Sequence, residues 1–310
     1  MASSRGARSI IFRAGWETGS MDWSESPAIA ARARAEEPVE FAGALGRLCG
    51  IFTPAAPAAS ADSRCVIFPA RPRFAFRRMP VLASRILAAS GFAAMRFDLA
   101  GSGESDGPSE IDSRHNPHGA DMLAAIEYLR ASRGFARFVV IGYCLDALCA
   151  IEAAITCASA IDGLVCIAPP ATAEPIQTSP MERLTRSAQS PANLLARLKN
   201  PATMLRSGGK MIAALGAAKA ASQVLPTLEQ GVRALANAHS RALFLYGEDD
   251  MLRREFAIAE RELFATLSDE ARARLQIEIW PGNVHSVEME PAIFERAMNW
   301  VRALAPGIDS

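Results

Sequence analysis

Three side chains that can act together in nucleophilic catalysis each follow an apolar run of the sequence: Cys144, Asp250 and His285. A cysteine thiol becomes a strong nucleophile when a histidine removes its proton, and a carboxylate can hold that histidine in the required tautomer. The carboxyl ends of parallel strands lie at one edge of a sheet, where ligands of α/β folds bind. If the apolar runs are neighbouring parallel strands, we expect the three side chains to meet.

The segment around Cys144 predicts a sharp turn between a strand and a helix. Residues 138–141 are apolar and mostly β-branched, as in a strand buried on both faces, and residues 147–154 have the pattern of a helix. A turn over 142–144 places the thiol at its tip, beside the backbone N–H groups that start the helix. The alternative is a small buried cysteine without a catalytic role.

Predicted strands and helices alternate along most of the chain. The predicted strands are 45–52 (an edge strand), 65–68, 92–99, 138–141, 164–167, 242–246 and 275–280. The predicted helices are 81–90, 121–130, 147–154, 256–267 and 293–304. This alternation favours an α/β fold, with a mostly parallel twisted sheet and helices on both faces.

The rhythm of strands and helices divides the chain into three parts. Residues 41–170 and 241–310 are expected to form the α/β core, and the proline-punctuated stretch 171–240 to form an inserted helical cap. Residues 1–40 lack sustained periodicity, so they are expected to be a poorly ordered N-terminal extension, and Met21 is an alternative start.

The composition is that of an ordinary globular protein. The chain has 310 residues, of which 50% are hydrophobic, and a formal net charge of zero. This balance gives no support to nucleic acid or an anionic membrane as a partner, and no apolar run is long enough to span a bilayer. The apolar residues near the N-terminus are too few for a secretory signal, so we expect a cytoplasmic protein.

Metal and cofactor sites are not expected. The six cysteines form no CxxC pair and are expected to be reduced. His115 and His118 are close in sequence, but their neighbourhood offers no further ligands for a metal. The glycine-rich turn 100–107 lacks the lysine and spacing of a phosphate-binding loop.

The loop 70–80 is rich in arginine. Four guanidinium groups in one loop could hold an anionic part of a substrate. The favoured interpretation is a solvated loop. The residues concerned are Arg71, Arg73, Arg77 and Arg78.

Longer motifs carry a resemblance to a known family. Residues 96–105 (Arg-Phe-Asp-Leu-Ala-Gly-Ser-Gly-Glu-Ser) resemble the R-x-D-x-x-G-x-G-x-S signature that precedes the nucleophile in α/β-hydrolases of the serine-aminopeptidase-like group. Residues 246–250 resemble the G-x-x-D turn that carries the acid, which favours Asp250 over Asp249, and residues 282–285 resemble the loop of the catalytic histidine. The order nucleophile, acid, histidine is that of the family. The resemblance spans about residues 41–305 and implies the α/β-hydrolase fold.

The resemblance implies hydrolysis of an ester or thioester of a small-molecule substrate through an acyl-enzyme. The oxyanion would lie against the backbone N–H groups of Leu145 and Ala70. Cap residues suggest an apolar acyl group, although they could equally form the core of the cap: Met204, Leu205, Met211, Ile212 and Leu215. Acyl transfer to an alcohol or amine is a variant of the same chemistry. A dehalogenase or epoxide hydrolase would require aspartate in place of Cys144.

One position departs from the family pattern. The turn reads Gly142-Tyr-Cys-Leu-Asp146, so the small residue expected after the nucleophile is replaced by Asp146. A carboxylate there would oppose a thiolate unless it turns away. A catalytically silent scaffold that binds a ligand or partner is therefore the rival hypothesis.

The cysteine turn and residues 198–206 and 250–256 are also similar to hydrolases associated with exosortase systems of bacterial exopolysaccharide clusters.

Overall fold

The computed structural model describes residues 26–56, 64–72, 78–108, 114–175, 223–286 and 289–304. Within these residues, eight strands form one sheet in the order β1-β2-β4-β3-β5-β6-β7-β8. Among the described strands, β2 runs in the direction opposite to the other seven. The strands are β1 (Glu37–Gly43), β2 (Gly46–Thr53), β3 (Arg64–Ala70), β4 (Ala93–Asp98), β5 (Arg137–Tyr143), β6 (Ile161–Ile167), β7 (Arg241–Gly247) and β8 (Leu275–Trp280).

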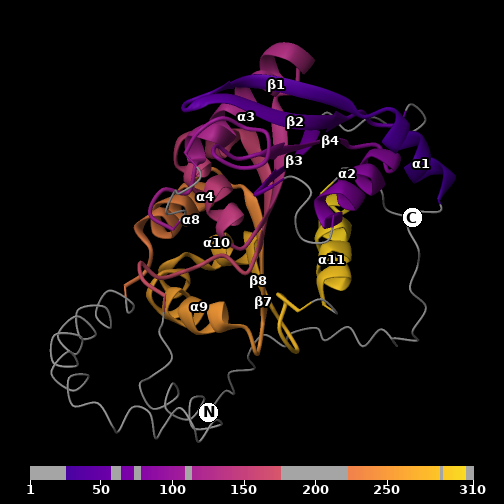
Figure 1. Ribbon diagram of the computed structural model, residues 1–310. Helices are drawn as coiled ribbons and strands as arrows, with labels where there is room; N and C mark the ends of the chain where they lie inside the picture. Colours follow the sequence, from indigo (N-terminus) through magenta and orange to yellow (C-terminus); the bar gives the residue numbers. More distant parts are fainter. Residues whose placement is uncertain are drawn as a thin grey trace, which may run out of the picture.

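Helices cover both faces of this sheet (Figure 1). Helices α2 and α11 lie on one face, and α3, α4, α8 and α9 lie on the other (Figure 1). The helices are α1 (Pro27–Arg34), α2 (Met79–Ala89), α3 (Gly119–Arg133), α4 (Leu145–Cys157), α8 (Pro226–Asn237), α9 (Met251–Glu262), α10 (Asp269–Arg274) and α11 (Glu290–Arg302). The predicted mostly parallel sheet with helices on both faces is confirmed.

The central strands are apolar because neither of their faces meets water. Every residue of β3 and β4 is buried, and so is every residue of β5 after its first. Such strands lack the alternation of a half-exposed strand and read as continuous hydrophobic runs. For this reason the apolar runs of the sequence predicted the central strands correctly. The predicted helices were found too, with ends that differ by a few residues.

The N-terminal boundary was placed too late. Residues 27–34 form α1, which begins with a proline at its first position and buries Ile29. Residues 37–43 form β1, which buries Val39 and Phe41 while its neighbours face solvent. The edge strand is therefore β1, and β2 lies inside it. Residues 1–25 of the predicted extension lie outside the described residues.

Much of the predicted cap, residues 176–222, lies outside the described residues, as do the five apolar residues proposed to line it. The two ends of this segment lie side by side, because Thr172 and Val224 form an antiparallel bridge. Helix α8, which belongs to the predicted cap stretch, packs closely on α4: a Cβ atom at Gly231 would lie 2.4 Å from the carbonyl oxygen of Ile151. This part of the stretch therefore covers the sheet.

A buried ion pair fixes the chain where this segment leaves the sheet. Glu255, on α9, is 1% exposed and pairs with Arg114 at 2.8 Å. The same carboxylate accepts the backbone N–H groups of Ala171 and Thr172 at 3.1 and 3.3 Å. Arg114 in turn donates to the carbonyl oxygen of Thr172. One carboxylate thus connects three segments that are distant in the sequence.

Replacing Glu255 by alanine is expected to lower the free energy of unfolding by about 3–5 kcal/mol, because it removes one partner of a buried ion pair. Urea denaturation measures the change. Glu229→Ala is the control: Glu229 forms an exposed pair with Arg233 on α8, worth about 0.5 kcal/mol or less. Equal effects of the two substitutions would contradict this account of the Glu255 pair.

Candidate active site

Cys144 lies on the strained turn that joins β5 to α4. Its backbone has φ 53° and ψ −125°, a combination that residues other than glycine rarely adopt. Its N–H donates to the carbonyl oxygen of Ile167 at 2.7 Å, which ties the turn to the end of β6. Such backbone strain costs about 1–3 kcal/mol and is typical of functional sites. The thiol is partly exposed and stands at the first turn of the helix.

Gly142 makes the turn possible. A Cβ atom at this position would lie 2.4 Å from the Cα atom of Ala147, so only glycine lets the strand and the helix approach. Gly142→Ala is expected to destabilise the fold by about 1–3 kcal/mol through overpacking. Urea unfolding would show the loss. Wild-type stability in this variant would contradict the contact.

Asp250 begins α9 and is 4% exposed. Its oxygen Oδ1 accepts the N–H of Leu252 at 2.9 Å, which caps the helix. Its other oxygen, Oδ2, lies 2.5 Å from Nδ1 of His285. The helix-capping and catalytic interpretations of this residue are therefore compatible, since each uses a different oxygen. Asp249 is exposed, and its N–H binds the loop after β8.

His285 lies between Asp250 and Cys144. Cys144 also interacts with the imidazole, and since Asp250 contacts Nδ1, Nε2 is the ring nitrogen left for the thiol. Burial lowers the pKa of His285, but the contacts with Asp250 and Cys144 raise it more, to about 9. This environment favours the protonated imidazole. The structure thus brings together all three side chains singled out in the sequence.

Tyr143 supports the histidine loop, a role that is not predicted from the sequence. Its ring meets the imidazole edge-on, with the centroids 5.1 Å apart, and its hydroxyl donates to the carbonyl oxygen of Val284 at 3.1 Å. The side chain of Asn283 accepts the N–H of His285 at 2.8 Å. These contacts hold the loop that carries the imidazole, and the Tyr143 ring packs against the imidazole itself. In the sequence, the one indication of this role is that an aromatic residue directly precedes the nucleophile.

Asp146 turns toward Arg71. Their side chains form an ion pair in which Nε of Arg71 lies 2.8 Å from Oδ1 of Asp146. Burial raises the pKa of the Asp146 carboxyl to about 6, although Arg71 opposes this shift. The negative charge expected near the thiol is therefore neutralised by a guanidinium group. Arg71 is not a solvated loop residue, as the sequence had suggested, but a partner of the nucleophile turn.

The two predicted oxyanion donors differ in their placement. Leu145 is the first residue of α4, where backbone N–H groups have no partner within the helix. Ala70 ends β3, and its carbonyl oxygen accepts the N–H of Leu99 at 3.1 Å. The N–H and C=O of one strand residue point to the same side, so the N–H of Ala70 also faces β4. Only Leu145 is well oriented toward Cys144.

Comparison with known families identifies the family of this chain. The sequence model of the family described as serine aminopeptidase, S33, matches residues 78–292. The chain belongs to this hydrolase family. The hydrolase therefore has the α/β-hydrolase fold that the motifs implied. No match was found among curated proteins.

Solved structures with the same fold have dissimilar sequences. A hypothetical protein from Pseudomonas aeruginosa matches with a TM-score of 0.56 and 16% identity, over 87% of this hydrolase and 94% of that chain. An esterase from Pyrococcus furiosus gives 0.54 and 16%, over 87% and 93%. An α/β serine hydrolase without a lid from Xanthomonas campestris gives 0.52 and 14%, over 88% and 96%. At these identities the likeness shows the fold alone.

The signature motif of the hydrolase stabilises the loop beside the site. The Asp98 carboxylate accepts the N–H of Glu104 at 3.0 Å, and the hydroxyl of Ser105 donates to the carbonyl oxygen of Asp98 at 2.7 Å. A Cβ atom at Gly103 would lie 2.1 Å from that carboxylate. Arg96 pairs with Glu36 at 2.9 Å. The motif therefore has a structural role in the described part of the chain.

Four other cysteines and one histidine of the hydrolase have structural surroundings. Burial raises the pKa of four thiols, those of Cys65, Cys149, Cys157 and Cys166. His118 is buried, with its Nδ1 3.0 Å from Asp121. Among the described residues, no group of three or more potential ligands is arranged around a metal site. None of the described helices is long and apolar enough to span a membrane.

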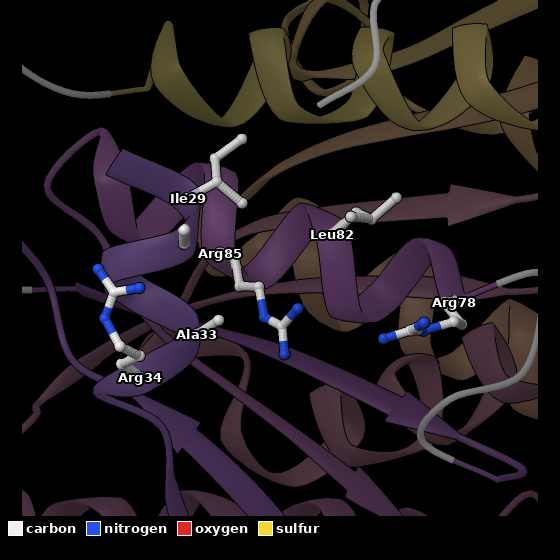
Figure 2. Close-up of a pocket in the computed structure, with 7 residues that line it drawn as sticks. Ile29, Ala33, Arg34, Arg78, Leu82 and Arg85 are labelled. Atoms are coloured by element: carbon white, nitrogen blue, oxygen red, sulfur yellow. The ribbon is translucent and has the colours of Figure 1, made fainter. Parts of the chain in front are cut away.

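A cavity of about 440 Å³ lies between α1 and α2 (Figure 2). Apolar side chains and three arginines line it: Ile29, Ala30, Ala33, Arg34, Arg78, Leu82 and Arg85. Cys144, Asp250 and His285 are not among these residues. This cavity is therefore separate from the place where the hydrolase brings its nucleophile and base together.

The stability of the hydrolase is expected to fall as the pH rises through about 9. The pKa of His285 is raised from 6.5 to about 9 in the folded protein. The stabilisation is complete below 6.5 and is lost as the folded protein releases the proton. Urea unfolding of the wild type and of His285→Gln, below pH 6.5 and above pH 9, measures it. A difference between the two proteins that does not shrink at high pH would contradict this assignment.

Proposed function

We propose that this hydrolase cleaves an ester or thioester through a covalent acyl-enzyme on Cys144, with His285 as general base and Asp250 as its partner. The observation that carries the proposal is the position of the imidazole. Nδ1 lies 2.5 Å from the buried carboxylate, and the same ring interacts with Cys144 on the strained turn. This is the arrangement of nucleophile, base and orienting acid that activates a thiol.

In the proposed reaction, the imidazole takes the thiol proton and the sulfur attacks the carbonyl carbon. The electron pair of the C=O bond moves to oxygen, and the N–H of Leu145 donates to the resulting oxyanion. Collapse of this intermediate expels the alcohol or thiol, which takes the proton from His285. The same imidazole then activates water, which releases the acid and restores the thiol. Asp250 holds the tautomer and stabilises the imidazolium.

The substrate class in this proposal is a small-molecule acyl ester or thioester. One neighbour of the same fold is named an esterase, which agrees with this class. Acyl transfer to an alcohol or amine remains a variant of the proposal, since it differs only in the group that attacks the acyl-enzyme. Adding butanol or hydroxylamine to the assay separates the two: a transferase forms the butyl ester or hydroxamate at the expense of the acid.

The rival hypothesis is a silent scaffold that binds a ligand or partner. The main argument for this rival is the Asp146 carboxylate near the thiol. The ion pair between that carboxylate and Arg71 weakens the argument. The test is turnover of p-nitrophenyl acetate and butyrate by the wild type beside Cys144→Ser. We expect turnover by the wild type and much slower turnover by the variant, because this site is arranged for a thiol. No turnover of esters or thioesters by the wild type would favour the silent scaffold.

The resemblance to exosortase-associated hydrolases belongs to the same proposal. It rests on the cysteine turn and on two stretches of sequence, of which residues 250–256 form the start of α9 and residues 198–206 lie outside the described residues. The described part, Asp250–Phe256, includes the proposed acid and the buried Glu255. A role in exopolysaccharide formation would require an acylated sugar or lipid-linked sugar as substrate. Activity on such acyl esters is the corresponding test.

A further inference from the structure

The loop after β3 offers no free backbone N–H toward the acyl site in its described residues, 70–72. The N–H of Ala70 faces β4, as argued from its carbonyl contact with Leu99. The N–H of Arg71 has a hydrogen bond with the Asp146 carboxylate. Pro72 has no N–H. An α/β-hydrolase normally takes one of its two oxyanion donors from this loop, so among residues 70–72 the second donor would have to be a side chain.

The side chain of Arg71 has an unused donor. Its Nε is bound to Asp146, while its terminal nitrogen Nη2 is buried and has no hydrogen-bond partner in the described structure. The guanidinium is planar, so one contact at Nε restricts the direction of the remaining N–H groups. A buried donor of a charged group without a partner is costly, and an acceptor from a substrate would relieve that cost.

The contact with Asp146 also places Arg71 beside the nucleophile. Asp146 is in the first turn of α4, two residues after Cys144, and it is 4% exposed. The guanidinium is therefore held against the helix end from which the N–H of Leu145 also emerges. We propose that Nη2 of Arg71 donates the second hydrogen bond to the oxyanion, and that Asp146 is a positioning residue that acts through Arg71. This inference rests on the proposed function.

The chemistry of the step requires a donor and no further reactant. When the sulfur bonds to the carbonyl carbon, the electron pair of the C=O bond becomes the charge on oxygen. A guanidinium donor meets that charge with a charge-assisted hydrogen bond and keeps its own proton. On collapse the pair re-forms the C=O bond, and the leaving group takes its proton from His285. Arg71 is thus unchanged at the end of each half-reaction.

Arg71→Met removes the donor and keeps much of the side-chain length. We expect kcat for p-nitrophenyl acetate to fall by about 10²–10³-fold, with KM changed by about threefold or less. Alkylation of Cys144 by iodoacetamide is expected to stay within about threefold of wild type, because displacement at a saturated carbon forms no oxyanion. Arg85→Met is the matched control. Arg85 also binds a carboxylate through Nε, since its Nε donates to Glu36 at 2.8 Å. Arg85 lines the cavity of Figure 2, away from the three candidate catalytic residues. Its kcat should equal that of the wild type.

Substitutions of Asp146 test the positioning role. Asp146→Ala should lower kcat by about tenfold to 100-fold, and Asp146→Asn should recover part of it, because the amide oxygen can still accept from Nε. The double variant Arg71→Met, Asp146→Ala should be no slower than Arg71→Met alone, because Asp146 acts only through Arg71. Additive losses would overturn the positioning role. Thermal unfolding identifies any variant that fails to fold.

The outcomes separate this inference from the proposed function. Wild-type turnover that depends on Cys144, together with an Arg71→Met kcat within about threefold of wild type, overturns the inference and leaves the proposed function standing. Slower alkylation in Arg71→Met, in proportion to the loss of kcat, assigns Arg71 to the thiolate instead and also overturns it. Absence of wild-type turnover overturns both.

Discussion

Replacing Cys144 by alanine is expected to reduce ester hydrolysis by about 10⁴-fold or more, since Cys144 is the nucleophile that the described residues place beside His285. His285→Ala should cause a loss of similar size, because the two residues act as a unit. The measurement is kcat/KM for p-nitrophenyl acetate. The double variant should be hardly slower than either single one.

Cys157→Ala is the matched control for the nucleophile. Cys157 lies on the same helix, α4, and is also partly exposed, but its thiol donates to the carbonyl oxygen of Ala153 at 3.2 Å. We expect wild-type turnover in this variant. Activity that survives Cys144→Ala, or that is lost equally in Cys157→Ala, would contradict the proposed nucleophile.

The second large effect is expected at Asp250. Asp250→Asn keeps an oxygen that can cap α9 through Leu252, so the fold should remain stable. The amide nitrogen then faces Nδ1 of His285 in place of the carboxylate oxygen; it donates and cannot accept the Nδ1 proton, so the imidazole is held in the wrong tautomer. We expect kcat to fall by about 10²–10⁴-fold. The pKa of His285, followed by NMR, should fall from about 9, because contact with Asp250 is among the causes that raise it.

Asp249→Asn provides the comparison for this substitution. Asp249 is the alternative acid in sequence, but its side chain is exposed and only its backbone N–H contacts the loop after β8. We expect both kcat and the pKa of His285 to remain at their wild-type values in this variant. Equal effects at 249 and 250 would show that the turn, and not the Asp250 carboxylate, is what the histidine requires.

The central strands were predictable from the sequence because a strand that is buried on both faces is a continuous run of apolar residues. Runs such as Phe138–Ile141 and Leu164–Ile167 are continuous and apolar, and all of these residues are buried. The edge strand β1 was harder to predict. In β1 only Val39 and Phe41 are buried, and the other five residues are polar or small, so the sequence predicts no strand here and places residues 37–40 in the N-terminal extension.

The candidate site was predictable where it depends on order along the chain. The nucleophile, acid and histidine each follow a strand, and the parallel sheet brings those strand ends together. What could not be predicted were contacts set by the direction of side chains. Whether Asp146 faced the thiol or turned away depends on Arg71, which is distant in sequence and belongs to a different loop. The support that Tyr143 gives to the loop of His285 depends in the same way on packing across the sheet edge.

The most direct test of this account is to trap the acyl-enzyme. The protein is mixed with p-nitrophenyl acetate, quenched in acid within the first turnover, digested and analysed by mass spectrometry. We expect one acetyl group on the peptide that carries Cys144, and no acetylated peptide in Cys144→Ala. Ester hydrolysis without acetylation of Cys144, or acetylation spread equally over the other thiols, would contradict the central claim.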